Sequence, residues 1–161
     1  MEKEFIILIN KYRALIFKVC NLYCHDAETR RDLFQEVVLQ LWKSFPSFRR
    51  QSLGSTWIYK VTLNTAISNF RKESKRVEKT SISSDQFEVP DMLPDTDSAD
   101  RWNSLQHAIN KLSDIEKAIV MLYLDEKSYE EMSEIIGIPI SNIGVRINRI
   151  KKKLTKIIKT H

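Results

Sequence analysis

Glycine and proline are scarce in this chain, with three glycines and four prolines among 161 residues. An all-β sandwich or barrel needs many tight turns, which these residues supply, so the scarcity argues against that class. Neither the dinucleotide pattern GxGxxG nor the phosphate-loop pattern GxxxxGK[ST] occurs. No apolar run approaches about 18 residues, so we expect no transmembrane helix. The first residues mix acids with bases and lack a small-residue cleavage site, so we expect a mature cytoplasmic N-terminus.

Cysteine is almost as rare, since the chain has only Cys20 and Cys24. Their spacing of four is not that of a CxxC motif. His25 is adjacent, but His107 and His161 lie far away in the sequence, and a metal site would need more ligands. We therefore expect two small buried apolar side chains, no metal and no cofactor.

Charge is distributed unevenly along the chain, whose overall net charge is +5. Residues 1–79 carry a net charge of +7, residues 80–100 carry six acids and no lysine or arginine, and residues 101–161 carry +4. Two basic blocks therefore flank an acidic one. Basic blocks favour binding to a polyanion, although solvated helix faces give the same composition in any soluble protein.

The acidic stretch also differs in composition, because it is serine-rich at first and then contains Pro90 and Pro94. It shows no sustained hydrophobic period, so we expect a linker over 80–100 that is extended or disordered. A hydrophobic content of 42% is enough to form a core on each side of it. The sequence therefore predicts an all-α protein with two small helical domains, 1–79 and 101–161, joined by this linker.

Three helices are predicted in the first block. Apolar residues at steps of three and four indicate an amphipathic helix over 4–24. Asp26 can cap a second helix that Pro46 ends, and Ser55 can cap a third that runs from 56 to about 78.

The loop before this third helix is basic and contains an aromatic residue, Phe48. The third helix itself places Lys60, Asn64, Arg71 and Lys75 close to one face. Cations that follow phosphates, beside a ring that stacks on a base, suit single-stranded nucleic acid. A three-helix core with a solvated surface remains the alternative.

The second block is organised as a helix-turn-helix. Helices are expected over 102–113 and from 114 to about 124. Ser128, followed three residues later by Glu131, predicts a capping box for a short helix that Gly137 ends. A turn follows, with Ser141 as the expected N-cap of a last helix over 142–159.

This last helix separates an apolar stripe from a cationic one. Ile143, Ile147, Ile150, Leu154 and Ile157 form the first stripe, and Asn142, Arg146, Arg149, Lys153 and Lys156 form the second. A helix, a glycine turn and a helix with an exposed basic stripe are typical of DNA recognition in the major groove. A solvated basic helix end is the alternative.

Four segments, in order, resemble the sigma-70 family of RNA polymerase factors, in its small extracytoplasmic function (ECF) group. The residues Asp32-Leu33-Phe34-Gln35-Glu36 match the D-L-x-Q-E segment of region 2.2, and Phe48 to Ser55 lie where the loop of region 2.3 falls. The residues Thr56-Trp57-Ile58-Tyr59-Lys60, with Asn64, Ala66, Ile67 and Arg71, resemble region 2.4. The stretch from Tyr129-Glu130-Glu131-Met132 through Gly137-Ile138-Pro139 resembles the start of region 4.2.

The resemblance implies a factor that binds core RNA polymerase and directs it to a bipartite promoter, without catalysis of its own. It implies core-polymerase binding by Asp32, Gln35 and Glu36. It implies −10 DNA binding by Phe48, Arg49, Arg50, Gln51, Ser52, Lys60, Asn64 and Arg71. It implies −35 DNA binding by Ser141, Asn142, Arg146, Arg149 and Lys153, of which Lys153 is expected to contact phosphate. It also implies an anti-sigma protein as a further partner.

The chain departs from the family pattern at two positions. Ser68 stands where family members often carry Asp, and Gly144 stands where the recognition helix usually carries Lys. A glycine inside a helix costs about 1 kcal/mol relative to alanine. These changes affect the expected promoter sequence rather than the expected function.

Two rival functions would each account for part of the sequence. An ordinary helix-turn-helix regulator that acts without polymerase would explain 101–161, but not the Asp32 to Glu36 segment. A small enzyme could use Asp32 and Glu36 as a carboxylate pair, yet no nucleophile–base pair accompanies them. The acidic linker is open to two interpretations, an RNA mimic that binds polymerase or a solvated spacer.

Overall fold

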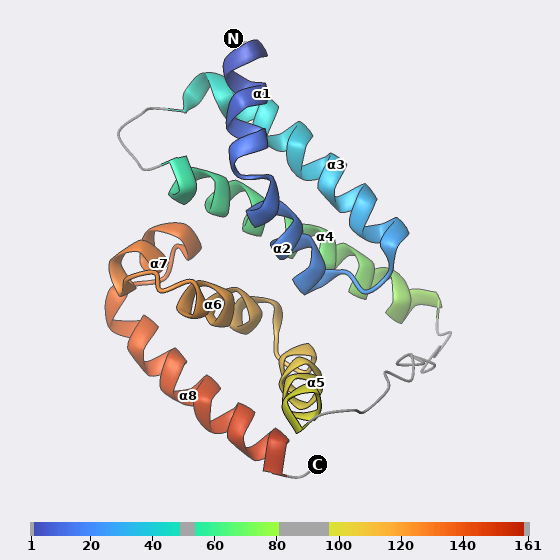
Figure 1. Ribbon diagram of the computed structural model, residues 1–161, viewed down its shortest axis with the longest axis vertical. Helices are drawn as coiled ribbons and strands as arrows, with labels where there is room; N and C mark the ends of the chain where they lie inside the picture. Colours follow the sequence, from blue (N-terminus) through green and yellow to red (C-terminus); the bar gives the residue numbers. More distant parts are fainter. Residues whose placement is uncertain (1, 49–53, 81–96, 160–161) are drawn as a thin grey trace.

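The computed structural model describes residues 2–48, 54–80 and 97–159 (Figure 1). Within these residues the chain forms eight α-helices and one 3₁₀ turn, with no strand, which confirms the all-α class. None of the helices in these ranges is both long and apolar enough to span a bilayer. The expected site residues Arg49, Arg50, Gln51 and Ser52, and most of the acidic linker, lie outside the described residues.

The N-terminal half contains α1 (Glu2–Lys11), α2 (Arg13–Tyr23), α3 (Ala27–Ser44) and α4 (Gly54–Thr80). The single helix expected over 4–24 is wrong, because the chain bends at Tyr12, where φ is −108°. A Cβ added to Gly54 would lie 3.1 Å from the Tyr12 hydroxyl oxygen, so the ring rests against the start of α4. A larger residue at position 54 would therefore require the Tyr12 ring to shift by a few tenths of an ångström.

The ends of α3 follow the sequence signals. The Asp26 carboxylate accepts a hydrogen bond from the Thr29 amide, which confirms the predicted N-cap. Hydrogen bonds from Thr29 lower the pKa of Asp26, because they stabilise its charged form. Pro46 lies in the 3₁₀ turn Phe45–Ser47 that follows α3. The predicted cap at Ser55 is wrong, since α4 begins one residue earlier and Ser55 lies in its first turn.

The C-terminal half contains α5 (Asp97–Asn110), α6 (Asp114–Leu124), α7 (Tyr129–Ile136) and α8 (Ile140–Lys159). The extended segment expected over 80–100 does not reach Asp100, because α5 begins at Asp97. The helix expected over 102–113 ends at Asn110. Ser141 is not an N-cap, since α8 starts at Ile140, directly after the proline.

Hydrogen bonds at the helix ends explain these differences. Ser113, expected at the end of a helix, is instead the N-cap of α6: its side chain accepts from the Glu116 amide, and the Glu116 carboxylate accepts from the Ser113 amide. Ser128 caps α7 through the Glu131 amide. The capping box is complete at Ser113 and incomplete at Ser128, where the Ser128 hydroxyl donates to the Glu131 carboxylate instead.

Gly137 ends α7 in the left-handed conformation, at φ 83°, as predicted. This turn sets the angle between α7 and α8, and its positive φ explains why a glycine stands there.

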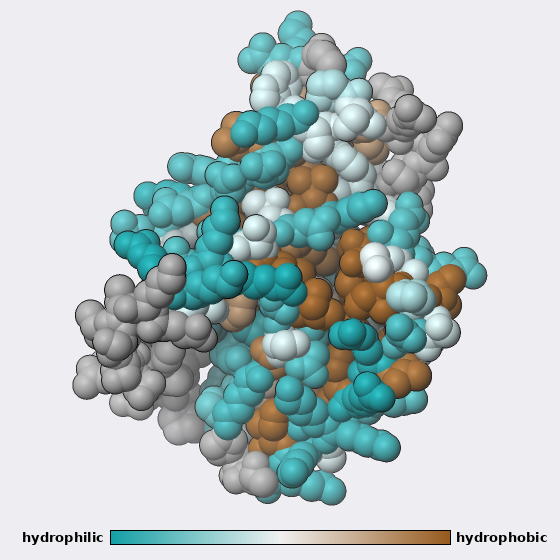
Figure 2. Space-filling model, turned by 180° about the vertical axis from the view of Figure 1, so that it is seen from behind, coloured by the Kyte–Doolittle hydropathy of each residue, from teal (hydrophilic) through white to brown (hydrophobic). Residues whose placement is uncertain are grey.

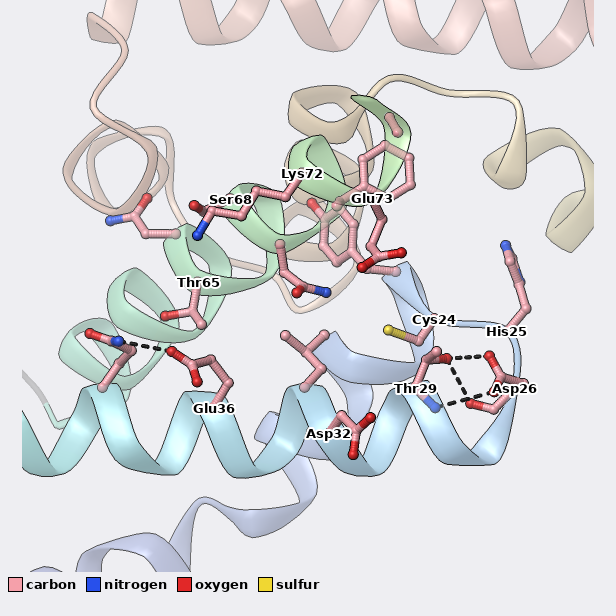
Figure 3. Close-up of a pocket in the computed structure, with 17 residues that line it drawn as sticks. Cys24, His25, Asp26, Thr29, Asp32, Glu36, Thr65, Ser68, Lys72 and Glu73 are labelled. Atoms are coloured by element: carbon pink, nitrogen blue, oxygen red, sulfur yellow. Dashed lines mark hydrogen bonds between the residues drawn. The ribbon is translucent and has the colours of Figure 1, made fainter. Parts of the chain in front are cut away.

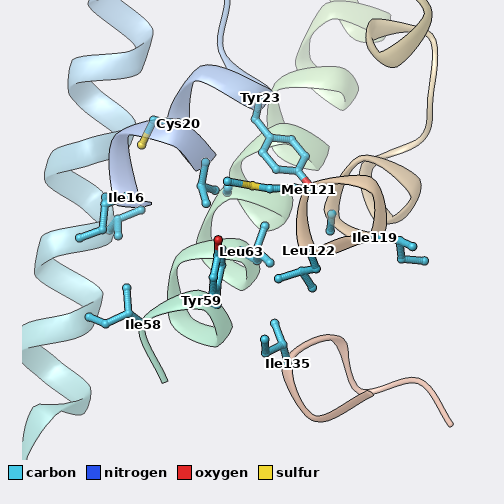
Figure 4. Packing of buried hydrophobic residues seen from close by; sticks show 14 of the residues in the cluster. Ile16, Cys20, Tyr23, Ile58, Tyr59, Leu63, Ile119, Met121, Leu122 and Ile135 are labelled. Atoms are coloured by element: carbon cyan, nitrogen blue, oxygen red, sulfur yellow. The ribbon is translucent and has the colours of Figure 1, made fainter. Parts of the chain in front are cut away.

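The two halves pack against each other, with α4 lying against α6 and α7. Their buried apolar residues form one continuous cluster. Figure 4 shows Tyr59 and Leu63 of α4 facing Leu122 of α6 and Ile135 of α7, all of them buried. The sequence alone does not predict whether the two halves pack together. This packing decides which surfaces of α4 are accessible.

Candidate functional site

An acidic groove runs between α3 and α4, with a volume of about 1080 Å³ (Figure 3). Asp26, Asp32 and Glu36 line it from the α3 side and Glu73 from α4. Asp32 and Glu36 are exposed and stand one helical turn apart, and the Gln40 side-chain amide donates to Glu36 over 3.0 Å. Four carboxylates in one groove favour a basic partner surface.

The structure thus brings Asp32 and Glu36 together. Gln35 is also exposed on α3, but it is not part of the groove lining. The exposed polar face that was predicted for this helix is therefore present.

An aromatic cluster stands where the basic loop leaves α3. The ring centroid of Phe48 is 4.6 Å from that of Trp57 and 6.4 Å from that of Phe45. Phe48 is partly buried in this cluster. The rings of Phe45 and Trp57 hold the Phe48 ring in place beside the start of α4.

The polar residues of α4 form a ridge between two grooves. Asn64, Ser68 and Lys72 line both the acidic groove and a second groove of about 470 Å³. Arg71 and Lys75 also line the second groove. Asn64 and Arg71 are thus brought to one surface, whereas Lys60 is exposed on α4 outside both grooves.

The opposite wall of this second groove, hereafter the interdomain groove, belongs to the C-terminal half and is apolar. Ile115 of α6 and Ile135 and Ile136 of α7 form it. The α4 ridge therefore borders the other half of the chain, although its polar residues stay exposed to solvent.

Polar contacts to Asp114 and to Asp125 hold the two halves together. Arg71 Nε lies 2.6 Å from the Asp114 carboxylate, and the Tyr23 hydroxyl donates to the Asp114 carbonyl over 2.6 Å. Asp114 raises the pKa of Arg71 through this pair, and burial, followed by Asp114, raises that of Tyr23. On the other side, Lys18 and the Tyr59 hydroxyl both bond to the Asp125 carboxylate.

Lys117 is buried between the halves, with 2% of its surface exposed. Its ammonium lies 5.0 Å from the ring centroid of Phe70 and 5.9 Å from that of Tyr23. Burial lowers the pKa of Lys117, and nearby Asp114 offsets part of this effect. Lys117 was not singled out from the sequence, because its position on the helix does not show that the N-terminal half covers it.

The first turns of α8 expose Ser141, Asn142, Arg146 and Arg149 on the helix-turn-helix. Lys153, expected beside them, has its ammonium 3.0 Å from the Glu116 carboxylate. Burial would raise the pKa of Glu116, but the hydrogen bonds from Ser113 and Lys153 outweigh it and lower that pKa. In this conformation Lys153 fastens α8 to the cap of α6.

Further along α8, a lysine cluster was not singled out from the sequence. Lys151, Lys152, Lys156 and Lys159 line one shallow hollow with Thr155. The Lys151 ammonium also lies 4.8 Å from the ring centroid of Tyr123. The run of three lysines at 151–153 is visible in the sequence. Helical spacing alone does not show which of these lysines face solvent and which contact α6.

Gly144 and Val145 mark the departure from the usual recognition helix. A Cβ at Gly144 would lie 3.5 Å from Cε2 of Tyr129, which is an ordinary contact. Val145 is 48% exposed, next to Arg146. Nothing in the packing of α8 therefore requires glycine at position 144.

Both cysteines are buried free thiols, as expected. Burial raises the pKa of Cys20 to about 12 and also raises that of Cys24. In the described ranges no three side chains of the His, Cys, Asp and Glu types gather as they would around a metal ion.

Residues 8–76 match the family described as Sigma-70 region 2, and residues 102–154 match Sigma-70, region 4. The chain is 27% identical to the ECF RNA polymerase sigma factor SigW of Bacillus subtilis, over 96% of this chain and 89% of that protein. It is 23% identical to the RNA polymerase sigma-H factor of Pseudomonas aeruginosa, over 98% and 87%.

A solved structure of the sigma factor RpoE with the anti-sigma factor NepR, from Bartonella quintana, has a similar fold. The TM-score is 0.70 at 21% identity, and the likeness covers 98% of this chain and 96% of that one.

Proposed function

Since this chain belongs to the sigma-70 family, in its extracytoplasmic function group, we propose how its described residues divide the work of promoter recognition. The chain is a sigma factor that binds core RNA polymerase and directs transcription initiation from specific promoters. An anti-sigma factor is a further partner, as for the structural neighbour. The proposed domains are 1–79 and 101–161 with the acidic linker between them, and the proposed location is the cytoplasm.

The helix-turn-helix is the observation that carries this function, because it presents a polar and cationic helix start after a left-handed glycine. Ser141, Asn142, Arg146 and Arg149 would meet the −35 element in the major groove. An arginine near the start of such a helix can pair with guanine, which is worth about 1–3 kcal/mol of discrimination. Lys153 would leave its ion pair with Glu116 and contact a phosphate of the DNA backbone instead.

The N-terminal half would read the −10 element. Phe48 offers a ring near the loop, and Lys60, Asn64 and Arg71 would follow the opened strand along α4. Arg49, Arg50, Gln51 and Ser52, outside the described residues, would supply charge and polar edges to an unstacked base. Replacing Arg49 and Arg50 by alanine should reduce open complexes on duplex promoters more than on premelted ones. An equal loss on both templates would refute a role in melting.

Core polymerase would bind at the acidic groove through Asp32 and Glu36, with Gln35 at its margin. Glu36→Lys should weaken binding to core polymerase at unchanged circular dichroism. Glu28→Lys is the matched control, because Glu28 is exposed on the same helix but does not line the groove. Equal affinity of the two variants in a pull-down would contradict this assignment.

Run-off transcription with purified core polymerase and genomic promoter fragments tests the function as a whole. We expect discrete transcripts that depend on added chain. A chain that binds the same fragments without polymerase and never supports transcription would be a helix-turn-helix regulator instead. The family has no catalytic step of its own, so the readout is polymerase activity only.

A further inference from the structure

The residue that points most directly away from the domain in the first turns of α8 is apolar. Ile143, Ile147 and Ile150 are buried and mark the side of α8 that packs on the domain. Since each residue turns the helix by about 100°, Val145 lies about half a turn away from this side. Its side chain is 48% exposed. Hydrophilic residues cover most of the lower part of the molecule in Figure 2, where Figure 1 places α5 and α8. A groove that receives α8 along its outer side would meet Val145 first.

The cationic stripe of α8 lies beside Val145 rather than in line with it. Around the helix axis, Arg149 lies about 40° and Arg146 about 100° from Val145, and Asn148 lies about 60° in the opposite direction. All three of these polar residues are exposed. Val145 therefore stands between an arginine and an asparagine that can both reach base edges, while Arg146 lies nearer the wall of the groove and its phosphates.

Gly144 leaves space beside Val145 on the same surface. The packing of α8 does not require a glycine there, since a Cβ would make only an ordinary contact with Tyr129, 3.5 Å from its Cε2 atom. Glycine inside a helix is nevertheless destabilising relative to alanine. What glycine provides is a close approach of a ligand to the backbone. With no side chain at position 144, a base edge can reach Val145 without obstruction from this side.

We propose that Val145 selects a thymine in the −35 element by packing against the 5-methyl group of that base. Thymine is the only base of unmodified DNA that presents a methyl group in the major groove, and apolar side chains are its partners. Valine has no hydrogen-bonding group, so a G·C pair at the same place would lose hydrogen bonds to water without replacement. This inference rests on the proposed function, because it takes the −35 element as the ligand of α8.

The test uses holoenzyme assembled from the full chain and core RNA polymerase. Promoter fragments with a randomised −35 element are first selected by binding to this holoenzyme. Each thymine of the selected element is then replaced by uracil, which lacks only the 5-methyl group, and fluorescence anisotropy measures the affinity. At one thymine we expect uracil to weaken binding about four-fold, the effect of one buried methyl group. In Val145→Ala this uracil penalty should disappear, because alanine lacks the two γ-methyl groups.

Ile140→Ala is the matched control. Ile140 is 51% exposed on the same helix, but it lies about 140° around the axis from Val145. This variant should keep the full uracil penalty.

Two results would overturn the proposal. One is a uracil penalty that is the same for wild type and Val145→Ala at every thymine, with wild-type circular dichroism for the variant. The other is a selected −35 element that contains no A·T pair. Failure of the proposed function would look different, because the wild-type holoenzyme would then enrich no −35 element and give no promoter-specific transcript.

Discussion

Replacing the buried Lys117 by methionine should stabilise the protein at neutral pH. The side chain is 2% exposed, and its ammonium meets two rings at 5.0 and 5.9 Å. No described carboxylate lies within ion-pair distance of it. Methionine keeps the length of the stem and removes the charge.

The size of the effect is a difference between two terms. Replacing a buried charge by an apolar side chain of similar volume gains up to about 1–4 kcal/mol. The lost cation–π contacts cost about 0.5–2 kcal/mol. We therefore expect a net gain of about 1 kcal/mol in the free energy of unfolding, or about 2–4 °C in melting temperature.

The gain should depend on pH in a defined direction. Burial lowers the pKa of Lys117 in the folded chain from 10.5, so unfolding takes up a proton between the two pKa values. The penalty of burying the charge is complete below the lowered pKa and disappears as pH rises toward 10.5. The advantage of the methionine variant should therefore shrink on the alkaline side.

Urea denaturation of both proteins from pH 7 to pH 10 measures this difference. Cys20 and Tyr23 also titrate on the alkaline side, but they are common to both proteins and cancel in the comparison. A methionine variant that is less stable at pH 7, or an advantage that grows with pH, would refute the argument. Lys117→Ala is the control, because it removes the charge and the packed stem together and should lower stability.

Five further substitutions test local features. Gly144→Ala should stabilise by about 0.5–1 kcal/mol, since the new Cβ has space beside the neighbouring ring; Gly137→Ala should destabilise, since φ there is 83°; thermal melts compare the two. Lys152→Ala and Lys153→Ala should each lower the salt slope of DNA binding by about 1, and only Lys153→Ala should also lower stability, because it releases the α6 cap; an equal loss of stability in both variants would contradict this division. Ser113→Ala should cost about 1 kcal/mol in urea denaturation, and an unchanged midpoint would contradict the capping role.

Signals local to one helix were predicted well from the sequence. Asp26 and Gly137 act through neighbours within a few residues, so their roles follow from residue type and spacing alone. The bend at Tyr12 could not be predicted in the same way, because it accompanies a contact with Gly54, which lies far along the chain. Ser113, in contrast, could have been predicted, because Ser113 and Glu116 have the same capping-box spacing as Ser128 and Glu131.

The site was predicted less completely than the fold. Exposed residues such as Asp32 and Arg146 lie on the expected helix faces, since helical period fixes the face. Helical period does not show which residue of another helix lies opposite an exposed residue. The pairing of Arg71 with Asp114 and of Lys153 with Glu116 therefore required the tertiary structure. For the same reason Lys117 could not be recognised as an interface residue.

The burial of the two thiols has a practical and a physiological consequence. Cys20 and Cys24 are sheltered in the core, and their raised pKa values leave little thiolate at neutral pH. Thiolate is the form that peroxides and maleimides attack, so neither residue is suited to sensing oxidants. A cysteine introduced on the exterior would therefore take a fluorophore selectively, and a pair of such dyes could report the separation of the two halves in real time.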